Sequence, residues 1–226
     1  MQGQQLADDA TVAIDYLADL GSVLQQVPRK PLGQAIAVLL EARARGRRIY
    51  VAGNGGSAAT ASHFVCDLVK TAQVTGYRPF RAFSLTDNTP LMTAWANDAS
   101  YADTFPRMIE GLVEPGDVVM GISASGNSPN IVQALEVATR LGARTIALLG
   151  FDGGAALHVA EIAVHVPCSH YGLAEDAHSA IGHAITDAVR TALSEERERS
   201  VMRILDDAAA VSDVSRTADA ATSSTP

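Results

Sequence analysis

Two short loops rich in glycine and serine are the first candidates for chemistry in this sequence. One reads Gly-Asn-Gly-Gly-Ser over residues 53–57, and the other reads Ser-Ala-Ser-Gly-Asn-Ser over residues 123–128. Glycine lets backbone N–H groups approach an anion closely, and the helix that each loop opens adds partial positive charge. Either loop alone fits an ordinary turn that caps a helix as well as it fits an anion site, but the two together favour a phosphate site.

The chemistry of these loops argues against a nucleotide. The segment 53–57 does not match the Gly-x-Gly-x-x-Gly pattern of dinucleotide-binding loops, and the chain has no Gly-Lys-Ser/Thr sequence that would end a triphosphate-binding loop. The hydroxyls of Ser123, Ser125 and Ser128 can instead donate to phosphate oxygens without carrying charge. A nucleotide is therefore the second choice.

Two histidines and two carboxylates form the other candidate group. His63 and Asp67 are four residues apart on the helix expected after the first loop, so they share one face. Glu175 and His183 are eight residues apart on the last expected helix, about 80° apart around its axis. Such a set can hold Zn²⁺ or a similar divalent ion, or it can serve as a general acid and base. A solvated or structural His–Asp pair remains the alternative at this point.

The elements that position these residues follow from the apolar pattern. Short apolar runs at 48–52, 80–85, 117–122, 145–149 and 162–166 predict five strands. Helical stretches between them, notably 58–70 and 129–141, favour βαβ units and a mostly parallel sheet covered on both faces. The segments 12–27 and 32–44 predict two N-terminal helices, and a last helix is expected over about 174–205.

The expected organisation is an α/β domain over residues 1–205, with the N-terminal helices as an extension, and a tail over 206–226. The tail is rich in Ala, Ser, Thr and Asp, and no Phe, Tyr or Trp follows Tyr171. Such a segment has little apolar surface to offset its ordering entropy, so it is predicted to be disordered. Trp95 and Tyr101 are expected in the core, and His178 is expected to be buried or at an interface.

Composition excludes several functional classes. The formal net charge of −8 argues against nucleic-acid binding, which needs a basic surface. No uncharged apolar run is long enough for a membrane span, and the N-terminus does not resemble a secretory signal. Two cysteines are too few for a disulfide scaffold. We therefore expect a soluble cytoplasmic protein with 47% apolar residues available for its core.

Several segments together resemble the sugar isomerase (SIS) domain family, and within it the phosphoheptose isomerases. They are Gly-Asn-Gly-Gly-Ser-Ala over 53–58 with His63 downstream, Gly-Ile-Ser-Ala-Ser-Gly-Asn-Ser over 121–128, Gly-Phe-Asp-Gly-Gly over 150–154, and Thr-Ala-Trp-Ala-Asn-Asp over 93–98 followed by Tyr101. The likeness covers roughly residues 10–195. It implies a five-stranded parallel sheet in a flavodoxin-like three-layer sandwich, assembled as a homotetramer with active sites between subunits.

The resemblance also implies an activity and a set of site residues. The activity is aldose–ketose isomerisation of sedoheptulose 7-phosphate to a heptose 7-phosphate through an enediol, with Asp67 as base and His183 as acid. A Zn²⁺ or other divalent ion would be held by His63, Asp67, Glu175 and His183. The implied substrate contacts are Asn54, Gly55, Gly56, Ser57, Asn97, Asp98, Ser123, Ser125, Ser128 and Glu175.

Four positions depart from the family's pattern. Asp67 is one methylene shorter than the family's glutamate, and Glu175 replaces a glutamine, which adds a negative charge that should favour a metal ion. Gly172 stands where some members have an aspartate, and Ala124 stands where a threonine is common. Because some members bind other proteins instead of catalysing, a non-catalytic phosphosugar-binding or protein-binding module is the alternative function.

Overall fold

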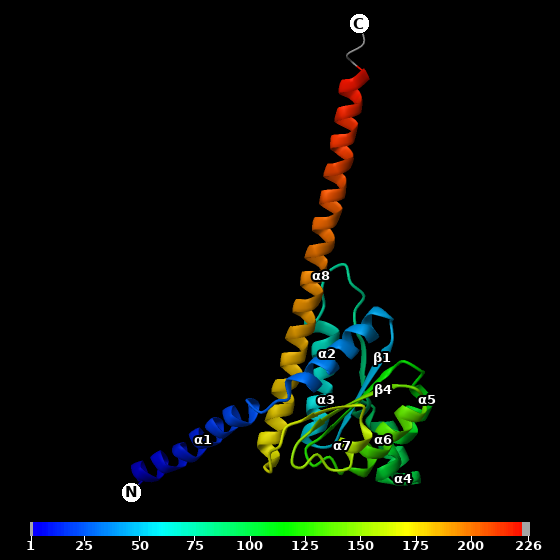
Figure 1. The fold of residues 1–226 in the computed structure, drawn as a ribbon. Helices are drawn as coiled ribbons and strands as arrows, with labels where there is room; N and C mark the ends of the chain where they lie inside the picture. Colours follow the sequence, from blue (N-terminus) through cyan, green and yellow to red (C-terminus); the bar gives the residue numbers. More distant parts are fainter. Residues whose placement is uncertain (1, 223–226) are drawn as a thin grey trace.

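Five parallel strands form the centre of the molecule. The computed structural model describes residues 2–222, with side chains described over 10–203. The sheet has the order β2-β1-β3-β4-β5 (Figure 1). Its strands are β1 (Arg48–Gly53), β2 (Arg81–Ser84), β3 (Val118–Ser123), β4 (Arg144–Leu149) and β5 (Ile162–His165). All pairings are parallel, so the carboxyl ends of the strands meet at one edge of the sheet.

Helices cover both faces of this sheet. Successive strand side chains point to opposite faces, so Val51 packs into one apolar core and Tyr50 into the other. The first core lies under α1 (Gln2–Leu24), α2 (Arg29–Ala44), α3 (Gly56–Cys66) and α8 (Tyr171–Thr222). The second lies under α4 (Thr89–Asp98), α5 (Thr104–Leu112), α6 (Pro129–Arg140) and α7 (Ala156–Val159). The predicted three-layer α/β fold is therefore confirmed.

The order in which strands are added to the sheet reverses between β1 and β3, which are parallel, hydrogen-bonded neighbours. Gly53 at the end of β1 lies opposite Ile122 in β3. The helix after β1 is α3, on one face, whereas the helix after β3 is α6, on the other face. Open parallel sheets bind ligands in the crevice outside such a switch point. Both glycine- and serine-rich loops therefore leave the sheet side by side at the crevice.

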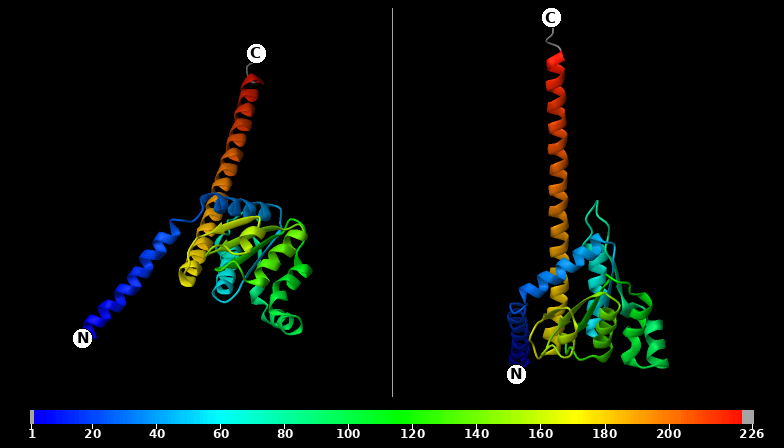
Figure 2. Two further views of the ribbon diagram at one scale, coloured as in Figure 1. Left: turned by 60° about the horizontal axis from the view of Figure 1, so that its bottom comes forward. Right: turned by 45° about the vertical axis from the view of Figure 1, so that its right-hand side comes forward.

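Two long helices extend beyond the sheet. The N-terminal part of α1 and the C-terminal part of α8 stand clear of the other elements in every view (Figures 1 and 2). The two helices are joined where Tyr16 donates a hydrogen bond of 2.5 Å from its hydroxyl to Asp176. This bond raises the pKa of Tyr16 to about 12, because the neutral phenol is the donor.

Residues 206–226 were predicted to be a disordered tail, but α8 continues past residue 205 as far as Thr222. Residues 206–222 contain no Gly or Pro, and they include several alanines, which have the highest helix propensity. Local propensity therefore extends the helix that the packed part of α8 begins. The last four residues, 223–226, lie outside the described part of the chain.

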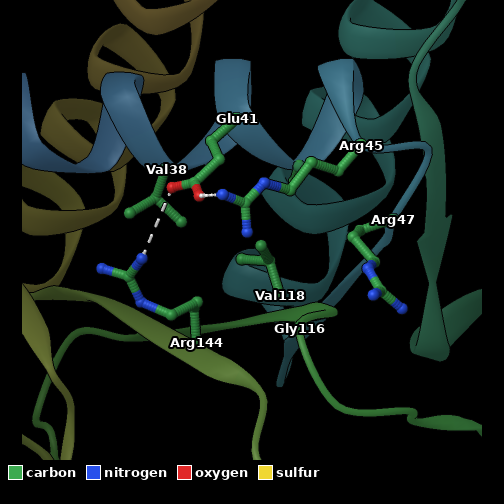
Figure 3. A pocket seen from close by; sticks show the side chains of 8 residues that line it. Val38, Glu41, Arg45, Arg47, Gly116, Val118 and Arg144 are labelled. Carbon is green, nitrogen blue, oxygen red and sulfur yellow. Dashed lines mark ion pairs between the residues drawn. The ribbon is translucent and has the colours of Figure 1, made fainter.

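Charged side chains surround a small hollow of about 120 Å³ at the opposite end of the sheet (Figure 3). Glu41 of α2 lies 3.0 Å from Arg45 and 3.7 Å from Arg144 of β4. Arg144 also pairs with Glu161, and this hydrogen bond lowers the pKa of the Glu161 carboxyl. The opposite charges of these residues are paired within the group. The ion pairs join α2 to the amino ends of the strands, away from the crevice.

His178 of α8 is buried against the first core, with 1% of its surface exposed. Its ring nitrogens have no hydrogen-bond partner among the described residues. Burial disfavours the charged imidazolium, which lowers the pKa of His178 from 6.5 to about 4. The sequence prediction of a buried or interface histidine is confirmed as burial within the protomer.

The buried His178 predicts a pH-dependent stability. Between pH 6.5 and about 4 the unfolded chain binds a proton that the folded chain does not, so the free energy of unfolding should fall by up to about 3 kcal/mol as the pH falls through this window. Chemical unfolding of the wild type and of His178→Leu at several pH values measures it. The variant should lose this part of the pH dependence, whereas His158→Gln, at an exposed histidine, should keep it. An unchanged pH profile in His178→Leu would contradict the assignment.

Candidate active site

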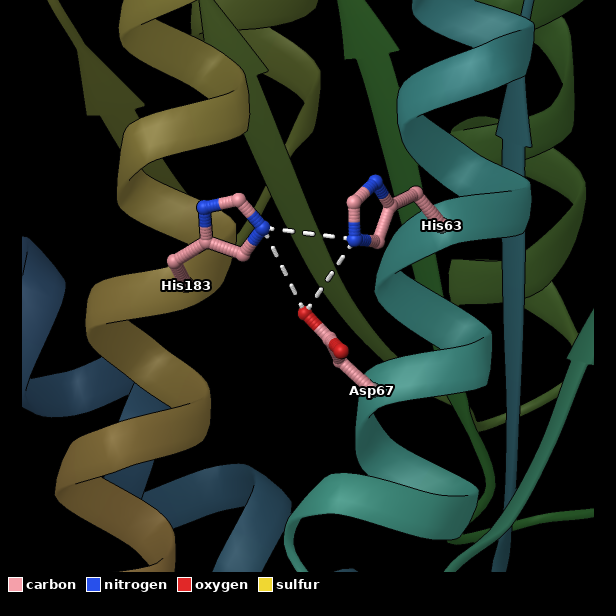
Figure 4. Close-up of side chains that lie close together, drawn as sticks. All are labelled: His63, Asp67 and His183. Carbon is pink, nitrogen blue, oxygen red and sulfur yellow. Dashed lines mark hydrogen bonds and ion pairs between the residues drawn. The ribbon is translucent and has the colours of Figure 1, made fainter.

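Three of the four predicted metal ligands meet between α3 and α8 (Figure 4). The Nε2 atoms of His63 and His183 lie 3.3 Å apart. Oδ2 of Asp67 lies 3.7 Å from Nε2 of His63 and 3.6 Å from Nε2 of His183. The sequence spacing predicted that His63 and Asp67 share a face, and the structure confirms it. It also brings His183 to the same point across 120 residues of chain.

The packing of α3 against α8 positions this group. Both helices lie over the first core, and Phe64 packs beside Gly182, where an added Cβ would stand 3.4 Å from the ring. His63, which precedes Phe64, and His183, which follows Gly182, therefore face each other. Asp67 begins η1 (Asp67–Thr71), a π-helical turn in which Thr71 donates a hydrogen bond of 3.0 Å to the Oδ1 of Asp67. Such turns are frequent at functional sites.

The structure does not bring Glu175, the fourth expected ligand, into this group. Metal-ligating atoms of His63, Asp67 and His183 lie within 4.8 Å of one another, and the group contains no other described residue. The carboxylate of Glu175 lies at the start of α3 instead, where an added Cβ at Gly56 would be 2.5 Å from Oε2. Two helical turns separate Gly56 from His63, about 10 Å along the axis. Glu175 therefore faces the first glycine-rich loop.

The three remaining donors suit a divalent metal. Two imidazole nitrogens and one carboxylate oxygen are a common donor set for catalytic zinc, which keeps a further position open for water or substrate. The two histidine side chains are each 57% exposed, whereas the Asp67 side chain is 15% exposed. The group is thus accessible to a ligand from solvent and fits such an ion.

The serine loop lies at the end of β3, as predicted. Ser123 is buried, and its hydroxyl accepts a hydrogen bond from the amide of Gly126 and lies 3.4 Å from the hydroxyl of Ser128. Ser128 is the residue before α6, yet its side chain makes no capping bond to that helix. Ser125 accepts a hydrogen bond from the amide of Asn127. Three hydroxyls therefore gather in one loop at a helix start.

The segment 150–154 braces the serine loop from the side. Gly126 has φ +66° and approaches the segment so closely that a Cβ would stand 2.0 Å from the carbonyl oxygen of Gly153. Asn127 accepts a hydrogen bond of 3.0 Å from the amide of Ala155. Phe151 adopts a positive φ of 45°, which is strained for a residue with a side chain. No sequence pattern indicates this strain.

The other predicted substrate contacts lie near the same crevice or at its rim. Gly55 precedes α3 with φ +54°, and Ser57 is buried in its first turn. Asn97 and Asp98 are exposed at the end of α4 and are hydrogen-bonded to each other. After them the chain forms η3 (Tyr101–Asp103), from which the Tyr101 hydroxyl donates a bond of 2.8 Å to Oδ1 of Asn54.

Tyr101 corrects one sequence expectation. It is 54% exposed, so it is not a core residue, and sequence reasoning missed its bond to Asn54. The departure at Gly172 also has a structural reason. A Cβ there would stand 2.8 Å from the hydroxyl of Tyr16, so a larger side chain would disturb the Tyr16–Asp176 bond.

Comparison with known proteins agrees with this geometry. The SIS domain profile matches residues 15–150. The chain belongs to the SIS domain family. It is 40% identical over 176 residues to a phosphoheptose isomerase from Geotalea daltonii, covering 78% of this chain and 91% of that protein. It is 36% identical to one from Pelobacter propionicus, covering 83% and 99%.

Solved SIS structures confirm the fold. A phosphoheptose isomerase from Neisseria gonorrhoeae is 28% identical, with a TM-score of 0.71 over 84% of this chain and all of that chain. One from Francisella tularensis is 25% identical, with a TM-score of 0.72 over 84% and 99%. The family membership predicted from the loops and the histidine motifs is therefore confirmed.

Proposed function

We propose that this SIS protein is an aldose–ketose isomerase that converts sedoheptulose 7-phosphate to a heptose 7-phosphate. The observation that carries the proposal is the convergence of Asp67 and His183, with 3.6 Å between Oδ2 and Nε2. The sequence relatives named phosphoheptose isomerases support the same reaction. The alternative, a non-catalytic binding module, would be favoured if these two side chains pointed into different pockets.

The proposed chemistry moves a proton between two neighbouring carbons of the sugar. The carboxylate of Asp67 takes the proton from the carbon beside the carbonyl, while the imidazolium of His183 gives a proton to the carbonyl oxygen, which yields the enediol. Returning the first proton to the carbon that carried the carbonyl, while the hydroxyl on the first carbon loses its proton and becomes the new carbonyl, gives the isomer. No atom or electron is gained or lost overall, so this chemistry needs no redox cofactor.

The serine loop and the loop at 53–57 are proposed to hold the phosphate and the polar end of the sugar. The supporting observation is that both loops leave neighbouring strands at the same crevice. The proposed contacts are Asn54, Gly55, Gly56, Ser57, Asn97, Asp98, Ser123, Ser125, Ser128 and Glu175. Gly56 and His63 are seven positions apart on α3, about 10 Å along its axis, a span that a seven-carbon chain ending in phosphate can bridge.

A bound Zn²⁺ or another divalent ion would polarise the oxygens of the sugar and lower the barrier to proton loss. His63, Asp67 and His183 are proposed to hold it, because their donor atoms already converge. The lone pair of His183 Nε2 cannot serve a metal and a proton at once. His183 would therefore act as the acid in the metal-free protein and as a ligand in the metal-bound protein.

The assembly is proposed to be a homotetramer. Val12, Ile14 and Leu17 on α1 are 71%, 63% and 60% exposed, which is costly for large apolar side chains on a helix that stands clear of the body. Packing against other copies would bury them. The resemblance to sugar isomerases, in which active sites lie between subunits, supports this arrangement.

A cytoplasmic location is proposed with the same function. Cys66 and Cys168 are both free, as is usual in a reducing compartment. None of the helices described over residues 2–222 is long and apolar enough to cross a membrane.

The turnover prediction concerns Asp67. Incubation of the wild type with sedoheptulose 7-phosphate should produce the aldose, which NMR detects. Asp67→Asn should lower kcat at least about 100-fold because the base is lost. Glu136→Gln, at an exposed position of α6, should turn over at the wild-type rate. Wild-type protein that binds sugar phosphates without turnover would favour the binding module instead.

The metal prediction separates the three-ligand group from Glu175. Titration calorimetry with Zn²⁺ should show one site per protomer, and His63→Ala should weaken the affinity at least about tenfold because a ligand is removed. Glu175→Gln should change it by less than about twofold. An equal loss in both variants would contradict the three-ligand site and restore Glu175 as a ligand.

The assembly prediction concerns the exposed face of α1. Light scattering should give the mass of four chains for the wild type and a smaller mass for Leu17→Glu, because a charge would be buried in the contact. Leu112→Glu, at a leucine of α5 that is 42% exposed, should keep the wild-type mass. A monomeric wild type would reject the proposal.

A further inference from the structure

A closed circuit of hydrogen bonds lies in the crevice at the switch point. The side chains of Asn54 and Asn130 bond reciprocally: Nδ2 of Asn54 donates to Oδ1 of Asn130 at 2.9 Å, and Nδ2 of Asn130 donates to Oδ1 of Asn54 at 3.0 Å. Tyr101 donates its hydroxyl to the same Oδ1 of Asn54. Thr104 lies 3.4 Å from Nδ2 of Asn130 and donates to the backbone carbonyl of Tyr101, which completes the circuit.

This circuit joins three segments that carry proposed substrate contacts. Asn54 belongs to the loop at 53–57, and Asn130 lies in the first turn of α6, directly after the serine loop. Tyr101 follows the segment with Asn97 and Asp98 by three residues. Because α3 and α6 leave for opposite faces of the sheet, the amide pair spans the crevice where the two anion-binding loops diverge.

The arrangement leaves Asn54 little capacity of its own for a ligand. Its carboxamide oxygen accepts from both Tyr101 and Asn130, and one of its two amide hydrogens is donated to Asn130. One N–H remains for substrate. Asn130 is 1% exposed, so its polar atoms depend on these partners for their hydrogen bonds.

We propose that Asn130 and Tyr101 are positioning residues that fix the distance between the phosphate-binding serine loop and the loop that begins with Asn54. Neither is among the proposed substrate contacts; they act through Asn54 and through the start of α6. Loss of the circuit should weaken binding of a ligand that touches both loops, and should spare a ligand that touches only the serine loop. The inference rests on the proposed function for the identity of the sugar.

The test uses two ligands that do not react. The heptitol 7-phosphate made by reducing sedoheptulose 7-phosphate has no carbonyl, so it can be titrated by calorimetry whether or not the protein turns over. Inorganic phosphate reports on the serine loop alone. Tyr101→Phe removes only the hydroxyl of an exposed ring, so it should fold normally, and Tyr77→Phe is the matched control because that ring lies under Arg43, outside the circuit.

The expected result is selective. Tyr101→Phe should weaken the heptitol phosphate about fivefold to tenfold, the usual effect of one lost hydrogen bond, while phosphate affinity changes by less than about twofold. Asn130→Leu, which keeps the size of the side chain and removes its hydrogen-bonding groups without adding a charge, should weaken it further. Tyr77→Phe should match the wild type with both ligands.

Equal affinity of the wild type and Tyr101→Phe for the heptitol phosphate would overturn the inference, as would an equal loss for both ligands, since that would indicate local damage to the phosphate loop. If the wild type fails to isomerise sedoheptulose 7-phosphate but Tyr101→Phe still weakens only the heptitol phosphate, the proposed function is rejected and the inference is kept. A wild type that binds neither ligand would overturn both.

Discussion

The site depends on a parallel sheet whose neighbouring strands β1 and β3 send their helices to opposite faces. The loops after the two strands start side by side and then separate, which opens a crevice. An anion can be held there by amides and hydroxyls of both loops only if their spacing is fixed. The half-buried amide pair between Asn54 and Asn130 spans that gap, and the close contact of Gly126 with Gly153 fixes the serine loop from its other side.

The group of His63, Asp67 and His183 depends on a second contact, between α3 and α8. Gly182 lets α8 approach the ring of Phe64, and this approach sets His183 beside His63 and Asp67. The π-helical turn that starts at Asp67 follows directly, with Thr71 bonded to the carboxylate. The carboxylate of Asp67 lies 3.7 Å from the imidazole of His63 and 3.6 Å from that of His183.

The structure also gives physical reasons for two departures from the sugar isomerase pattern. Glycine at 172 makes room for the Tyr16 hydroxyl, which fastens α1 to α8. Glu175 sets its carboxylate against Gly56, at the start of α3, where a negative charge interacts favourably with the helix dipole. These changes bear on the assembly of the domain and on the polarity of the first loop rather than on the histidine group.

The apolar runs at the five strands and the glycine- and serine-rich loops after two of them were sufficient to predict the α/β fold and the edge of the sheet where the two loops lie, because strand burial and turn chemistry are local properties. The sequence also placed His63 and Asp67 on one face, since helical spacing decides it. The meeting of His183 with that pair, the displacement of Glu175 from it, and the exposure and bonding of Tyr101 needed the tertiary structure. Each depends on how elements far apart in the chain pack together, and no local pattern encodes that packing.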